Sequence, residues 1–82
     1  MDTFLGLPMA IQAAKAGGSM PTVFNAANEL AVNKFLHKKI RFLDIYDIIG
    51  QSMERHKVIE NPGLEEILET ESDTYQWIES RW

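Results

Sequence analysis

Cysteine is absent from this 82-residue sequence. A chain without cysteine forms no disulfide, offers no thiolate to a metal ion and has no cysteine nucleophile. Hydrophobic residues make up 45% of the sequence and charged residues 24%, which is ordinary for a folded protein and too apolar for a disordered one. The length suffices for one domain, whose small core must be held together by packing alone.

Long apolar runs are also missing. No uncharged stretch approaches the ~20 apolar residues that cross a bilayer. The first residues lack the basic start and the apolar run of a signal peptide. We therefore expect no membrane association and a cytoplasmic protein.

Positive charge is scarce and unevenly placed. The net charge is −4, with five basic and four acidic residues in positions 1–53 but three basic and eight acidic residues in positions 54–82. The one basic cluster is the short segment HKKIR at residues 37–41. A protein that binds a phosphate backbone normally carries a broad basic face. We therefore expect no nucleic-acid partner.

The spacing of apolar residues, prolines and glycines predicts an all-α fold. Five helical segments are expected, at residues 8–16, 21–36, 41–56, 64–69 and 72–82. Pro8 and Pro21 suit the first turn of a helix, and Gly17 and Gly18 end the first one. Asp73 begins a capping box for the last segment. No β-strand alternation and no repeat is visible, so we predict a single helical domain over residues 1–82, a compact bundle or superhelix of four to five helices.

The core is predicted from the helical periodicity. Its expected members are Val23, Leu30, Phe35, Ile45, Ile48 and Ile49. Asp44 and Asp47 fall in the first turn of the third segment, where a helix dipole favours negative charge.

The segment NAANELAV, residues 25–32, is unusual for a helix. Asparagine is a poor helix former because its amide competes for nearby backbone groups. On a helical wheel Asn25, Asn28 and Glu29 lie opposite the main apolar face, but Val32 and Leu36 lie among them, so this side does not resemble an ordinary solvated face. We interpret the three polar residues as a structural polar network between helices, with ligand binding or catalysis as the alternative.

Other candidate residues favour simple interpretations. His37 and His56 are too far apart to form an (i, i+4) metal pair and are expected at helix ends or in solvent. Lys34 should extend its ammonium outward from an apolar side. We expect the three glutamates of the fourth segment, Glu65, Glu66 and Glu69, to be exposed to solvent. We expect the two tryptophans, Trp77 and Trp82, to pack against the rest of the protein. No catalytic, cofactor-binding or metal-binding residue is predicted in this chain.

Residues 6–45 carry a family resemblance. The segment runs GLPMAIQAAKAGGSMPTVFNAANELAVNKFLHKKIRFLDI. It resembles the start of the C-terminal helical domain of 1-deoxy-D-xylulose 5-phosphate reductoisomerase, whose pattern includes a Gly-Gly helix end, a proline, NAANE, an Ala-Val pair, Phe-Leu and I-x-F-x-D-I. The likeness continues more loosely to about residue 69. Pro8 departs from the pattern and is expected to shift only the start of the helix.

The resemblance implies a supporting role rather than a chemical one. Enzymes of this family rearrange and reduce deoxyxylulose phosphate to methylerythritol phosphate in the non-mevalonate isoprenoid pathway. The resemblance implies NADPH and a divalent metal, Mg²⁺ or Mn²⁺, for a homodimeric parent enzyme, both held by other domains. It also implies that the partner of this domain is the catalytic domain of the same chain. The alternative is an independent helical module that binds another protein.

Overall fold

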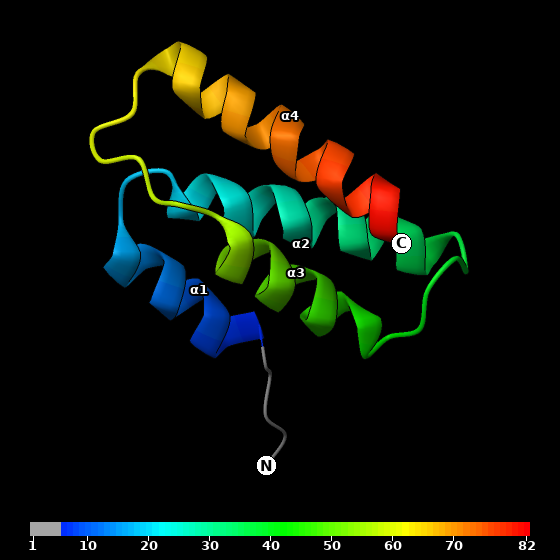
Figure 1. Ribbon diagram of the computed structural model, residues 1–82. Helices are drawn as coiled ribbons and strands as arrows, with labels where there is room; N and C mark the ends of the chain where they lie inside the picture. The colour runs from blue at the N-terminus through cyan, green and yellow to red at the C-terminus, as the bar shows by residue number, and fades with distance from the viewer. Residues whose placement is uncertain (1–5) are drawn as a thin grey trace.

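The computed structural model describes residues 6–82, and these residues form four helices and no strand (Figure 1). The helices are α1 (Gly6–Ala16), α2 (Met20–Leu36), α3 (Asp44–Arg55) and α4 (Leu64–Arg81). The predicted all-α class is confirmed. No helix in the described part of the chain is both long enough and apolar enough to span a bilayer.

Helix α2 lies at the centre of the arrangement. It packs against α1, α3 and α4, whereas α1 and α4 have no direct packing with each other. Figure 1 shows α4 along one side of α2 and α1 along the other, with α3 beside α2 between them. Most of the core is therefore built on the faces of one helix.

The turn between α1 and α2 is made by two glycines in the left-handed region, with φ of +69° at Gly17 and +54° at Gly18. Glycine adopts this region without the strain that a Cβ atom brings. Position 18 requires glycine for a second reason: a Cβ atom there would lie 2.3 Å from the carbonyl oxygen of Ile59. The turn therefore fits directly against the connection between α3 and α4.

The two predicted helices at residues 64–69 and 72–82 are one continuous helix, α4. The segment between them contains no glycine or proline, and Thr70 and Thr74 are buried against the bundle. The Thr74 hydroxyl donates to the Thr70 carbonyl within the helix. Asp73 does not cap a helix but accepts a hydrogen bond from Arg55 at 3.1 Å. The predicted capping box is therefore wrong, and the described residues contain four helices, within the predicted four to five.

Helix α3 begins later than the predicted residue 41. The carboxylate of Asp44 accepts hydrogen bonds from the Arg41 backbone N–H at 2.8 Å and from its guanidinium at 3.0 and 3.3 Å. Hydrogen bonding from Arg41 lowers the pKa of Asp44. These contacts hold residues 41–43 as a turn before the helix, and they place Asp44 and Asp47 in its first turn, as expected.

The predicted core is confirmed at Val23, Ile45, Ile48 and Ile49, each of which is buried. Leu30 and Phe35 are only partly buried and pack at the edge of the core. The reason is that small residues, rather than these two larger ones, fill the contacts of α2 with its neighbours. The remaining buried hydrophobic residues are Ala13, Met20, Ala26, Ala27, Ala31, Met53 and Ile78.

Truncating Ile49 to alanine should lower the free energy of unfolding by about 2–5 kcal/mol, because it removes buried methyl groups and leaves a cavity. Ile49 is 1% exposed, whereas Ile11 is 48% exposed and provides a matched control. Urea unfolding of both variants measures the difference. Equal losses for Ile49→Ala and Ile11→Ala would contradict this placement of the core.

Candidate functional site

Asn25, Asn28 and Glu29 all point outward from α2 and are exposed. Within residues 6–82 neither asparagine amide has a hydrogen-bonding partner, whereas Glu29 has one. The interpretation as a polar network between helices is therefore wrong for the two asparagines, whereas Glu29 does bond to another helix. The reason is that the three neighbours of α2 cover its alanine side, and no described segment covers the side that carries the asparagines.

The alanines of the same motif lie on the opposite, covered side. Ala26, Ala27 and Ala31 are 2%, 0% and 0% exposed. A methyl side chain lets a neighbouring helix approach closely. The alanines of the motif therefore belong to the core, and its asparagines and glutamate lie on a surface that no described segment covers.

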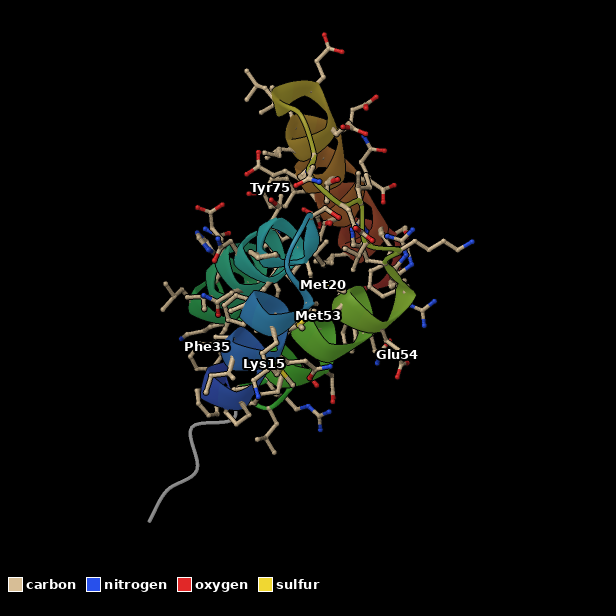
Figure 2. The ribbon with its side chains drawn as sticks, turned by 90° about the vertical axis from the view of Figure 1, so that its left-hand side faces the viewer. Lys15, Met20, Phe35, Met53, Glu54 and Tyr75 are labelled. Carbon is tan, nitrogen blue, oxygen red and sulfur yellow. The ribbon has the colours of Figure 1, made fainter. Side chains whose placement is uncertain are left out.

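Of these three polar residues, Glu29 is the one whose side chain makes a hydrogen bond within residues 6–82. Its carboxylate accepts from the Tyr75 hydroxyl at 2.6 Å, which links α2 to α4 on the side where Figure 2 labels Tyr75. The hydrogen bond to Glu29, together with burial, raises the pKa of Tyr75 to about 12. The phenol therefore stays protonated and acts as a donor, not as an acid.

A second link joins the same two helices. The Lys34 ammonium lies 2.6 Å from a carboxylate oxygen of Glu79, and their side chains are 7% and 58% exposed. Hydrogen bonding from Lys34 lowers the pKa of Glu79. The lysine therefore extends its ammonium toward the surface, as expected, but ends in an ion pair instead of open solvent. Between the two links lies a shallow pocket that Glu29, Leu30, Asn33, Tyr75 and Glu79 line.

His56 lies at the end of α3, as one form of the expectation had it, and its ring is partly buried. The Ser19 hydroxyl lies 2.7 Å from His56 Nε2, and the same oxygen accepts the Ile59 backbone N–H at 2.7 Å. Ser19 is fully buried and makes no helix-capping bond. We assign the hydroxyl proton to a bond with a neutral His56 ring, because the described residues offer this buried hydroxyl no other acceptor.

Burial of the ring lowers the pKa of His56 below its ordinary value of 6.5; the charge of Arg55 lowers it further, and that of Asp73 opposes the shift. A hydroxyl beside an imidazole is an arrangement that nucleophilic catalysis can use. Here the serine is inaccessible to any substrate, so the pair joins the α1–α2 turn to the segment after α3. Sequence reasoning missed this contact because its partners lie 37 residues apart.

Metal ligands do not gather anywhere in residues 6–82 as a cluster of three or more histidines, aspartates or glutamates. Glu65, Glu66 and Glu69 are exposed on α4, as expected. Glu66 accepts the backbone N–H of Gly63 at 2.9 Å and so closes the start of that helix. Trp77 and Trp82 pack against the core, also as expected.

Comparison with known proteins gives the family. A family model described as the DXP reductoisomerase C-terminal domain matches residues 1–77. This chain belongs to that family. The match extends past residue 69, where the likeness in sequence motifs became weak, and includes most of α4.

Relatives of the DXP reductoisomerase C-terminal domain are similar over almost all of this chain. The 1-deoxy-D-xylulose 5-phosphate reductoisomerases of Agathobacter rectalis and Lachnospira eligens are 56% and 51% identical over 82 residues, which is 100% of this chain and 22% of each relative. A Bacillus cereus reductoisomerase is 51% identical over 77 residues, 94% of this chain and 20% of the relative. The chain thus spans about a fifth of the length of these curated relatives. No solved structure matches.

Replacing Glu79 with glutamine should destabilise this domain more than replacing Lys34 with methionine. The Glu79 change leaves a covered ammonium without a carboxylate, and stranding a buried polar group costs about 1–3 kcal/mol. The Lys34 change leaves Glu79 in water and places an apolar side chain of similar length in a covered position. Urea unfolding measures both.

Asp73→Asn is the control, because the Arg55–Asp73 pair is more exposed, with side chains 35% and 60% accessible. Exposed pairs contribute about 0–1 kcal/mol. A loss for Glu79→Gln no larger than that for Asp73→Asn would show that Lys34 needs no compensating charge.

The stability of the domain should fall as pH falls below the ordinary pKa of histidine, because the folded state holds His56 at a lowered pKa. The unfolded chain binds the proton first, so stability is complete above about pH 6.5 and is lost progressively down to the pKa of the folded state. Melting temperatures between about pH 8 and pH 5 measure this. His56→Gln should flatten the profile in that range, and His37→Gln, at an exposed position, should not. A profile unchanged by His56→Gln would refute the assignment.

Proposed function

We propose that this chain serves as the C-terminal domain of an enzyme that converts 1-deoxy-D-xylulose 5-phosphate to 2-C-methyl-D-erythritol 4-phosphate. The observation that carries the proposal is its match, over its whole length, to about a fifth of proteins named as that reductoisomerase. Residues 1–82 act as one helical domain within the larger chain. Such an enzyme is an oxidoreductase of non-mevalonate isoprenoid biosynthesis.

The role of the domain is structural. Its described polar contacts join its own helices: Glu29 to Tyr75, Lys34 to Glu79, and Ser19 to His56. The groups among them whose pKa is shifted, Tyr75, Glu79 and His56, each bond to another element of the bundle, and structural contacts of this kind also shift pKa values. NADPH and the Mg²⁺ or Mn²⁺ ion belong to the preceding domains of the enzyme, and the domain supports the catalytic one. The parent is a homodimer in the cytoplasm.

Transplantation tests the proposal. Replacing the matching 22% of the Agathobacter rectalis reductoisomerase with this chain should give a chimaera that retains reductoisomerase activity within about tenfold, a change of ~1.4 kcal/mol in the barrier. The same relative truncated before this segment is the control and should be inactive or unstable. A chimaera that folds but has lost activity by ~1000-fold would count against the proposal.

The isolated 82-residue chain should not bind NADPH. Its sequence contains no G-x-G-x-x-G segment after a strand, the fingerprint of a dinucleotide-binding turn. Isothermal titration calorimetry with NADPH measures this directly. Micromolar binding that a single substitution in this chain abolishes would show that the domain contributes to the cofactor site.

A further inference from the structure

The side of α2 that no other helix covers continues into a group of exposed hydrophobic residues. We call these six residues the outer surface: Asn25, Asn28, Val32, Leu36, Phe42 and Leu43. Leu36, Phe42 and Leu43 are 69%, 54% and 65% exposed. We propose that the outer surface is where this domain docks on the preceding part of the reductoisomerase chain. The inference rests on the proposed function and adds the contact surface.

Aromatic rings join the part of the outer surface on α2 to the part formed by Phe42 and Leu43. Phe42 makes edge-to-face contacts with Phe35 of α2 and Tyr46 of α3, each with ring centroids 5.6 Å apart. Beside these rings is a hollow lined by Arg41, Phe42, Leu43, Tyr46 and Asp47. The end of α2 and the start of α3 therefore present one surface with a depression that an apolar side chain can enter.

The composition of the outer surface is that of an interface. A solvated helix face normally carries several lysines and glutamates, whereas this one carries two amides, a valine and a leucine, and its one glutamate, Glu29, is bonded to Tyr75. Clustered exposed hydrophobic residues usually mark a contact with another protein surface. The amides of Asn25 and Asn28, which have no partner within residues 6–82, can pair with the backbone of a docked segment.

The rim of the outer surface is basic although the chain as a whole has a charge of −4. Lys38 and Lys39 are exposed in the connection that leads to Phe42. Lys38 has a φ of +60° because it ends α2 in a Schellman motif, in which the Lys38 N–H donates to the Phe35 carbonyl and the Lys39 N–H to the Lys34 carbonyl, each at 2.9 Å. A rim of this charge fits an acidic border on the partner surface.

The comparison with longer relatives indicates which partner this is. In the Agathobacter rectalis relative, the matched segment is only 22% of the protein, so a much larger body is attached to this domain. Since the matched family is a C-terminal domain, that body precedes α1. In Figure 1 α1 begins toward the same end of the bundle as α3, so the larger body is tethered at the end of the bundle where α3 also begins.

The test uses the chimaera described above, with charges placed on the outer surface. The test variant combines Leu36→Glu with Leu43→Glu. The control variant combines Leu64→Glu with Leu68→Glu, which changes two leucines at the start of α4 that are 73% and 54% exposed. Figure 1 shows that this start of α4 lies at the opposite end of the bundle from the connection between α2 and α3. Melting temperature and reductoisomerase activity are measured for each chimaera, and circular dichroism and sedimentation for each isolated chain.

We expect Leu36→Glu with Leu43→Glu to lower the melting temperature of the chimaera by at least about 3 °C, with activity falling in parallel, and to leave the isolated chain unchanged. The control pair should change neither. Asn28→Ala should shift the chimaera in the same direction by a smaller amount.

Equal effects of the two pairs in an active chimaera would overturn the docking surface and leave the proposed function standing. A larger effect of the control pair would overturn it as well. So would an isolated chain that forms dimers which Leu36→Glu with Leu43→Glu disperses, because the occupant would then be a second copy. An inactive chimaera before any surface change is the separate failure that counts against the proposed function.

Discussion

The close packing of three helices on the alanine side of α2 is the constraint on which the rest of the structure depends. Ala26, Ala27 and Ala31 leave room for neighbouring side chains such as Ile48 and Ile78, both 0% exposed, to complete the core. A larger residue at any of these alanines would push a neighbouring helix away and break several contacts at once. Such overpacking of a core lowers stability. A chain without cysteine has no covalent link to compensate.

Polar contacts set the relative positions of the helices once the alanines have allowed them to approach. The pairs Glu29–Tyr75 and Lys34–Glu79 join α2 to α4 at two places along their length. Arg55 lies 5.0 Å and Arg81 5.2 Å from the ring centroid of Trp77, so a cation lies close to this ring from both α3 and α4. Such contacts are weak where they are exposed. Their contribution is to select one alignment among those that the apolar packing permits.

The sequence predicted the helical class, three of the four helices and the isoleucines of α3, because these follow from local spacing and from glycine and proline. It did not predict that residues 64–82 form one helix, since a threonine-rich segment has no strong local preference and is held helical by burial of Thr70 and Thr74. The asparagines of NAANE were not interpreted correctly, because a helical wheel shows that a second side of the helix differs from a solvated face but not whether a neighbour covers that side. The contact of Ser19 with His56 and Ile59 depends on tertiary structure alone, and one sequence carries no signal for it.

The Ile59 amide acquires a particular property from its place against Ser19. It lies in an irregular connection, yet it donates to a fully buried hydroxyl, while the Ile59 carbonyl accepts the Ser19 N–H at 3.0 Å. No local helix or strand protects this amide, so it exchanges with solvent when the connection between α3 and α4 moves away from the α1–α2 turn. Local and subglobal openings of this kind have their own free energies. The hydrogen-exchange rate at one backbone position therefore reports how often this connection separates from the turn while the helices stay packed.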